Sequence, residues 1–465
     1  MKLSPFHLCL AFLLLVVTGI SHSQESPKLS LAEAVNTAIQ HNPELEAVRK
    51  DAEAATLGKA EARSYYLPQV KFSSDATKSD SDLFEFDTSS IPEEFQDSFN
   101  FGDMGFAGSF FTNKLTLGQL IYDRSVIGQI NLAHLQEEAA NWQRTGQEQQ
   151  VAFETVSAYL DILLASEILG VQKQRLQLAD KQLQTTQTSF DAGLRIRTDV
   201  LRAELSRSSA ERDVVSAEIA VKNAQVALNK IMGTSLTSFY TIESGDLPHY
   251  DPPQDIITNM QNLDPYFSLA QDNNPAIKIS SLLVEQSYEN INIARGEFYP
   301  RVSIGGSAGF KDSSRPELED KEWAIQATVE IPIFEGGRRF AKVRRTTKQN
   351  EASAKRYEET ARTVLTSVEQ ASLALQEQFR NLEIAVKAER VAQENYERFQ
   401  NLYQEGLADS LDITQSLTEL VVAQTDVVRA RYGYLKIYNN LLLATGTIPV
   451  TGDAYNTIQW LSIIH

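Results

Sequence analysis

Apolar residues return at the 3.6-residue period of an α-helix through two very long stretches of this chain, residues 123–190 and 335–403. Neither stretch contains a proline, and Gln, Glu, Arg and Ala, which favour helices, fill many of the remaining positions. Shorter stretches with the same period follow at residues 198–232 and 411–445. A helix of this length has no globular core of its own, so the pattern predicts long antiparallel helices packed as coiled coils.

Before each long helical stretch the period changes from 3.6 to 2, which is typical of β-strands. Hairpins are predicted at about residues 67–122 and 300–334. The clearest alternation places apolar side chains at Ile325, Ala327, Val329, Ile331 and Ile333. Strands of about ten residues have the length that crosses a membrane. A half-buried strand of a soluble β-sandwich shows the same alternation, so the pattern alone leaves both interpretations open.

Aromatic residues lie at all four predicted junctions between helix and strand, which favours the membrane interpretation. Amphipathic rings are enriched where a membrane meets water. A four-stranded sheet in lipid would also leave two edges of unpaired backbone groups, each costing several kcal/mol. We therefore expect the sheets of several identical protomers to join edge to edge. The junction aromatics are Tyr65, Tyr66, Tyr122, Phe298, Tyr299 and Phe334.

The chain contains an internal duplication with a period too long for a solenoid. Asn42-Pro43 recurs as Asn274-Pro275, and Gly193-Leu194 recurs as Gly406-Leu407. The motifs divide the chain into the following predicted segments. They are a first repeat at 24–233, an inter-repeat equatorial linker at 234–265, a second repeat at 266–446 and a C-terminal tail at 447–465. The two copies differ most in the hairpin, where the first carries a long acidic loop at residues 79–113.

Residues 1–23 are predicted to be a secretory signal peptide, with Lys2 at its start and the apolar run Leu8–Val17. The single cysteine, Cys9, lies inside this segment, which excludes disulfides and cysteine-based metal sites from the mature chain. The formal net charge of −18 argues against nucleic acid as a partner. No later stretch reaches 18 consecutive apolar residues, so no transmembrane helix is expected.

The sequence gives no support for catalysis, a bound metal or a cofactor. The histidines after residue 23 are not at ligand spacing, and no nucleophile triad or glycine-rich phosphate loop can be assembled. Gly336-Gly337 with Arg338-Arg339 is interpreted as a flexible turn between strand and helix. We therefore predict that the protein is not an enzyme.

The duplicated order of helix, hairpin and helix resembles the outer-membrane efflux proteins of the TolC type. The Asn-Pro pairs, Tyr66-Leu67-Pro68 with Phe298-Tyr299-Pro300, and two Gly-Leu-x4-Asp stretches carry the resemblance. It implies a mainly α-helical fold with a small β part: a homotrimer whose protomers each give four strands to a shared, roughly twelve-stranded transmembrane β-barrel. Below it, the long helices form a periplasmic α-barrel, which docks to a periplasmic adaptor protein and an inner-membrane transporter.

The resemblance also implies that the tunnel closes near the helix turns. Asp199 and Asp412 match the constriction, where rings of carboxylates would favour cations. The alternative is that each is an acid at a helix start, which stabilises the dipole by about 0.3–1 kcal/mol. A second acidic ring of some family members is replaced by Gln415. Tyr403 matches a position that holds the tip closed, but the basic partner position of the family is Ala408 here.

Gly193-Leu194 and Gly406-Leu407 are predicted to form the turns that contact the adaptor. The alternative is an ordinary glycine cap at a helix end, and both can hold if the glycine turns the chain while the leucine makes the contact.

The sequence thus predicts a passive exit duct of a tripartite efflux or type I secretion system in the cell outer membrane, with lipid around its barrel. The alternative is an exported periplasmic coiled-coil scaffold without channel activity.

Overall fold

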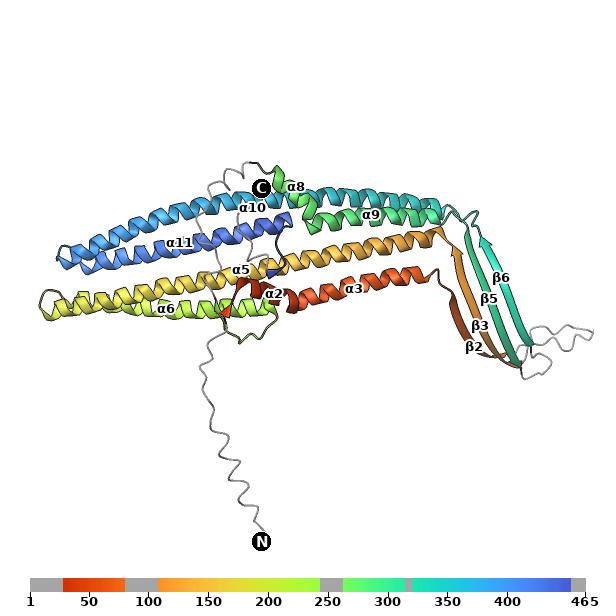
Figure 1. Ribbon diagram of the computed structural model, residues 1–465, viewed down its shortest axis with the longest axis horizontal. Coiled ribbons are helices and arrows are strands. Elements are labelled where there is room, and N and C mark those ends of the chain that lie inside the picture. The colour runs from red at the N-terminus through yellow and green to blue at the C-terminus, as the bar shows by residue number, and fades with distance from the viewer. Residues whose placement is uncertain (1–27, 80–107, 243–261, 314–319, 453–465) are drawn as a thin grey trace, which may run out of the picture. The chain divides into compact units, whose positions relative to one another are not determined.

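The structure is a computed structural model that describes residues 28–79, 108–242, 262–313 and 320–452 (Figure 1). The predicted signal peptide and most of the acidic loop, of the linker and of the tail lie outside these residues. The first half contains β1 (Lys28–Leu29), α2 (Leu31–His41), α3 (Pro43–Ser64), β2 (Gln69–Ser79), β3 (Gly108–Tyr122), α5 (Arg124–Asp191), α6 (Arg197–Met232) and β4 (Thr241–Ile242). The second contains α8 (Asp264–Asn273), α9 (Pro275–Gly296), β5 (Arg301–Ser313), β6 (Asp320–Glu330), α10 (Arg338–Gln404) and α11 (Ser410–Thr445).

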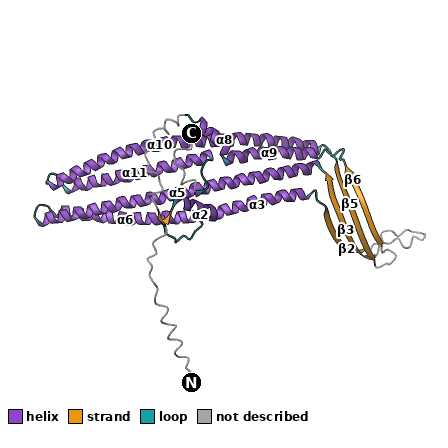
Figure 2. Cartoon of the chain, viewed as in Figure 1, coloured by secondary structure: helices purple, strands orange, loops and turns teal. Residues whose placement is uncertain are grey.

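Two compact units make up the chain, and they do not follow the boundary between the repeats. One unit contains the turns of the long helices and comprises the described residues up to Glu46, Gly146–Asn274 and those from Leu365 onward. The other contains the sheet and comprises Ala47–Thr145 and Pro275–Val364. Figure 2 shows that helices form most of the chain and that the longer strands gather in one sheet.

Helices of both repeats pack against each other in the unit that contains the turns. Apolar and small side chains of α5 are buried at three- and four-residue steps, including Val156, Tyr159 and Leu163. The Tyr432 hydroxyl of α11 donates to Glu167 Oε1 of α5 at 2.7 Å, and burial together with that carboxylate raises the pKa of Tyr432. The buried side chains of α11 recur at the spacing of one helix face, as its apolar period predicted. This face packs into the core.

The recurring Asn-Pro and Gly motifs meet in space and form the same joint twice. Asn42 Nδ2 donates to Ile231 O at 2.9 Å, just before Gly233, and Asn274 Nδ2 donates to Ala444 O at 2.9 Å, just before Gly446. Both glycines have positive φ, and a Cβ on Gly233 would lie 2.2 Å from His41 O. Only glycine allows this close approach, which explains why both motifs recur together.

The larger sheet is antiparallel and has the strand order β2-β3-β5-β6. The central pairing of β3 with β5 joins the hairpins of the two repeats, so neither repeat forms the sheet alone. Side chains that face each other across the strands alternate between an apolar and a polar face. The apolar face exposes Val70, Phe72, Leu115, Leu117, Ile304, Ile325 and Val329.

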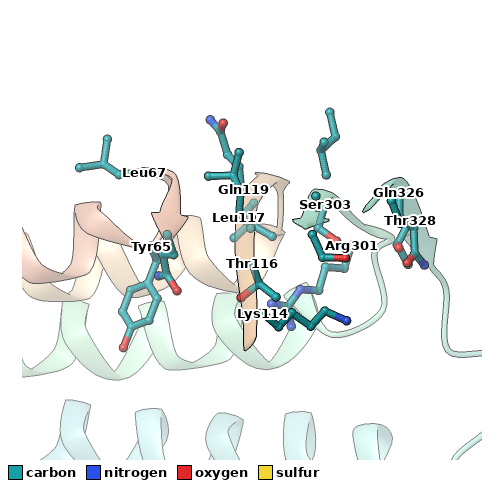
Figure 3. A pocket seen from close by; sticks show the side chains of 18 of the residues that line it. Tyr65, Leu67, Lys114, Thr116, Leu117, Gln119, Arg301, Ser303, Gln326 and Thr328 are labelled. Carbon is teal, nitrogen blue, oxygen red and sulfur yellow. The ribbon is translucent and has the colours of Figure 1, made fainter. Parts of the chain in front are cut away.

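A cavity of about 620 Å³ is lined mainly by the polar face of the sheet, together with Leu117, Ile304 and other apolar residues. Figure 3 shows side chains of this cavity, among them Lys114, Thr116, Arg301, Ser303 and Gln326. Small residues alternate with these polar ones, since Gly118 pairs with Gly305 and Ser307 pairs with Ala324. One face of the sheet is therefore suited to lipid and the other to water.

Candidate functional site at the paired helix turns

The two turns between the long helices have the same backbone geometry. Gly193 has φ +74° and Gly406 has φ +76°, a left-handed conformation that ends α5 and α10. The N–H of Leu194 donates to Ser189 O and that of Leu407 to Leu402 O, both at 2.8 Å. The side chains of these leucines are 77% and 73% exposed. Each glycine thus forms the turn, and each leucine is available for contact with another molecule.

Arg195 connects the first turn to the second. Its guanidinium lies 4.2 Å from the centre of the Tyr403 ring, a cation–π contact. Arg195 Nη2 also donates to Tyr403 O at 3.0 Å, and the Ala408 carbonyl lies 3.5 Å from the same guanidinium. The Tyr403 hydroxyl forms a hydrogen bond with Thr186 Oγ1 of α5 at 2.9 Å. Tyr403, only 4% exposed, is thus held by α5 and by the turn that follows it.

A small apolar core lies next to the contact between Arg195 and Tyr403. It includes Tyr396, Ile413, Leu417 and Leu420, with Leu178 of α5 packed against it. Burial raises the pKa of the Tyr396 hydroxyl. The two turns therefore rest on one shared core.

Asp412 and Asp199 have different surroundings although they occupy equivalent places. Asp412 forms a reciprocal cap with Asp409, the N-cap residue that precedes α11. The Asp409 carboxylate accepts from Asp412 N at 3.0 Å, and Asp409 N donates to Asp412 Oδ2 at 3.1 Å. α6 begins after Ile196, which offers no side-chain cap, and Asp199 in its first turn is 8% exposed. Asp412 is thus the third helical residue of a capping box whose N-cap is Asp409.

Asp409 has the clearest electrostatic perturbation at the turns. The N–H groups of Asp412 and Leu411 point at its carboxylate and lower its pKa, with smaller contributions from Arg202 and Arg195. Gln415, exposed on the next turn of α11, donates to Glu419 Oε1 at 3.0 Å. At position 415, where some proteins of the TolC type carry an acid, this chain thus has an amide that is hydrogen-bonded to a carboxylate.

Sequence reasoning missed Arg195, Thr186 and Asp409. The spacing of Asp409 and Asp412 matches a capping box and could have been recognised. Arg195 and Thr186 gave no signal, because their partners lie 208 and 217 residues away.

The predicted interface aromatics lie at the helix-side ends of the strands, in the unit that contains the sheet. The Tyr66 hydroxyl donates to Asp123 O at 2.9 Å, which ties the end of α3 to the start of α5. The Phe298 ring packs edge-on against Phe340 with their centroids 5.1 Å apart. Tyr65, Tyr299 and Phe334 are 48%, 53% and 85% exposed. Tyr122 is the last residue of β3 and is partly buried.

The described residues contain neither a metal-binding cluster nor a membrane-spanning helix. No group of three or more His, Cys, Asp or Glu side chains in this part of the chain could hold a metal ion. None of its helices is both long and apolar enough to cross a membrane.

A sequence profile of the family described as outer membrane efflux protein matches residues 34–234 and 266–447. The chain belongs to this family. It is 22% identical to the outer membrane protein TolC of Vibrio cholerae over 431 residues, which cover 90% of this chain and 91% of that protein. It is 21% identical over 444 residues to the alkaline protease secretion protein AprF of Pseudomonas aeruginosa, with 94% and 87% of the two chains covered.

Solved structures share the fold of this outer membrane efflux protein. The CmeC outer membrane channel of Campylobacter jejuni superposes with a TM-score of 0.72 at 19% identity, covering 90% of this chain and 85% of that one. The mainly helical class, the family and the outer-membrane location predicted from the sequence are confirmed. The alternative of an exported scaffold without channel activity is not favoured.

Proposed function

We propose that three copies of this outer membrane efflux protein form a passive exit duct, and that none of its residues performs catalysis. The observation that carries this proposal is the four-stranded sheet, whose outer strands β2 and β6 each have an edge with no partner in the described chain. Its exposed apolar face suits lipid, but one copy leaves both edges open. Three copies joined β6 to β2 would close a barrel and satisfy these backbone groups.

The proposed duct receives its substrate from an inner-membrane transporter through a periplasmic adaptor protein. Relatives named for efflux and for protease secretion support a transport role, in which the pump supplies the energy. Leu194 and Leu407 are proposed as the adaptor contacts because both are large, apolar and exposed at the turns. Crosslinking of the adaptor to the wild type and to a Leu194→Ser/Leu407→Ser double variant tests this, and unchanged crosslinking and efflux would rule it out.

Fractionation and conductance test the duct itself. The protein should extract from the outer membrane as a trimer and conduct ions in planar bilayers. We propose that Asp412 and Asp199 form the constriction with Tyr403 and Gln415 beside them, so Asp412→Asn should raise single-channel conductance or weaken block by multivalent cations. Asn retains an oxygen that can accept from Asp409 N, so this variant removes charge and keeps the cap.

Asp426→Ala is the matched control, because it removes a carboxylate from the same helix two heptads further on, at a side chain that is 54% exposed. It should leave conductance unchanged. If Asp412→Ala alters the channel and Asp412→Asn does not, the residue acts as a cap rather than as a ring of charge, and the constriction assignment fails.

A further inference from the structure

The corner between β6 and α10 exposes an unusual amount of apolar surface. Ile331 is 58% exposed, Ile333 94% and Phe334 85%, and Phe340 in the first turn of α10 is 67% exposed. Large apolar side chains exposed together mark a binding surface rather than ordinary protein surface.

The corner is held in one shape by Arg339, which is 6% exposed. Its guanidinium donates to Pro332 O at 2.6 Å and to Glu297 O at 3.1 Å, and it lies 5.0 Å from the centre of the Phe298 ring. Glu335 forms an ion pair with the same guanidinium at 3.2 Å. The exposed apolar side chains are therefore presented from a backbone that is tied to α9.

Cations follow directly on α10. Residues 338–348 contain six Lys or Arg and no Asp or Glu: Arg338, Arg339, Lys342, Arg344, Arg345 and Lys348. The equivalent residues 126–136 of the first repeat contain no Lys, Arg, Asp or Glu. This concentration stands out in a chain with a net charge of −18, and it belongs to one repeat alone.

Two of these cations form no ion pair with the described part of the chain. Lys342 forms an ion pair with Glu297, and Arg338 pairs with Glu335 at 2.8 Å. Arg344 and Arg345 are exposed and have no ion-pair partner among the residues that the structure describes. They are free to bind an external anion.

The spacing between the apolar residues and the arginines matches the distance from the acyl chains to the headgroup phosphates of a membrane. Phe340 and Arg344 are four residues apart and lie on the same face of α10. Arg345 is seven residues beyond Arg338, about 10 Å along the helix. The headgroup region on each side of a bilayer is about 5–8 Å thick, so a long arginine side chain here can reach a phosphate while the apolar residues contact acyl chains.

We propose that this corner is a binding surface for anionic phospholipid headgroups in the leaflet on the helix side of the sheet. Ile333, Phe334 and Phe340 insert at the boundary of the acyl chains, and Arg344 and Arg345 bind the headgroup phosphates. The inference rests on the proposed membrane barrel, and it adds an anchor that fixes the depth of the protein in the membrane through the second repeat alone.

The test compares the Arg344→Gln/Arg345→Gln variant with a Lys355→Gln/Arg356→Gln control. The control pair lies eleven residues further, on the same face of α10, and removes the same charge about 16 Å further from the sheet. Retention of phosphatidylglycerol or phosphatidylcholine by the purified trimer is measured by native mass spectrometry, and apparent affinity by thermal stabilisation in doped micelles. The wild type and the control should prefer phosphatidylglycerol, and the variant should bind it about thirtyfold more weakly.

Three results would overturn the proposal. The first is an equal loss of phosphatidylglycerol in both double variants, and the second is equal stabilisation by inorganic phosphate alone. The third is failure of a maleimide to label the Arg344→Cys variant in the delipidated trimer. Such protection would mean that a second copy covers the corner. Outer-membrane extraction and conductance measured on the same preparations separate failure of this surface from failure of the duct.

Discussion

The two helix turns share a backbone geometry but differ in the side chains that cap and connect them. Both use a glycine at positive φ, and both expose a leucine directly after it. The second turn begins α11 with an aspartate cap, whereas the first begins α6 with Ile196 and no side-chain cap. The first turn instead contributes Arg195, whose side chain donates a hydrogen bond to Tyr403 O at the second turn. The duplication has thus preserved the geometry while the side chains diverged into a donor turn and an acceptor turn.

The largest expected effect comes from removing the donor. Arg195→Ala loses a charged hydrogen bond and a cation–π contact, which together contribute about 2–3 kcal/mol. If the turns are coupled, amide hydrogen exchange should accelerate in both, around residues 190–198 and 403–411. The measurement is hydrogen exchange read by mass spectrometry on the purified protein.

Arg197→Ala is the control for this variant. Arg197 is 56% exposed, and its ion pair with Glu204, at 3.9 Å, lies on the surface, where such pairs contribute little. It should leave both turns as they are. Faster exchange confined to the first turn in Arg195→Ala would show that the arginine braces its own turn and that the coupling is wrong.

The next effect tests whether the shared geometry is equivalent. Gly193→Val and Gly406→Val each place a β-branched residue at positive φ, which should cost about 1–2 kcal/mol. A Cβ at either glycine would meet nothing within 4 Å, so the cost is conformational and should be equal in the two turns. Urea unfolding of the purified protein provides the measurement.

Asn tolerates left-handed geometry, so Gly193→Asn and Gly406→Asn should be milder than the valine variants. Unequal costs for the two valine variants would mean that the turns are not equivalent in solution.

The smallest effect concerns the cap of the acceptor turn and its pH dependence. The Asp409 pKa is lowered in the folded state, so its stabilisation is fully present above the unfolded pKa of about 3.9 and is lost as pH falls through the folded pKa. Exchange of the amides of Leu411 and Asp412 should therefore gain an acid-induced opening below about pH 4 beyond the intrinsic pH effect.

Asp409→Asn should remove this acid-induced opening, and Ile196→Asp should create a cap and its pH dependence at the start of α6. An acid-induced opening that persists in Asp409→Asn would assign it to another group.

Elements with a regular period were the most predictable part of the molecule. The pattern predicted a long helix at about 123–190, and α5 runs from Arg124 to Asp191. Proline-free helical periods and alternating strands report local geometry, which the sequence carries residue by residue. The recurrence of Asn42 and Gly233 was also visible, but their contact was not, because the bond to Ile231 spans 189 residues.

Arginines with contacts inside the protein were the least predictable part of the candidate sites. Arg339 belonged to a segment interpreted as a flexible turn, and Arg195 to a turn valued only for its glycine and leucine. An arginine usually indicates a solvated surface. Burial of Arg339, and insertion of Arg195 beside Tyr403, follow from partners distant in sequence, which no local pattern encodes.

The last described residues of the chain pack against α2, close to the first described residues. Gly452 N donates to Asn36 Oδ1 of α2 across 416 residues, and a Cβ on Gly452 would lie 2.2 Å from Ala32 O. The side of α2 that carries Asn36 therefore gains this partner only after 416 further residues have been made, although α2 also packs against α6. A contact of such long sequence separation forms late, so a copy that lacks it should remain open to chaperones and proteases rather than enter assembly.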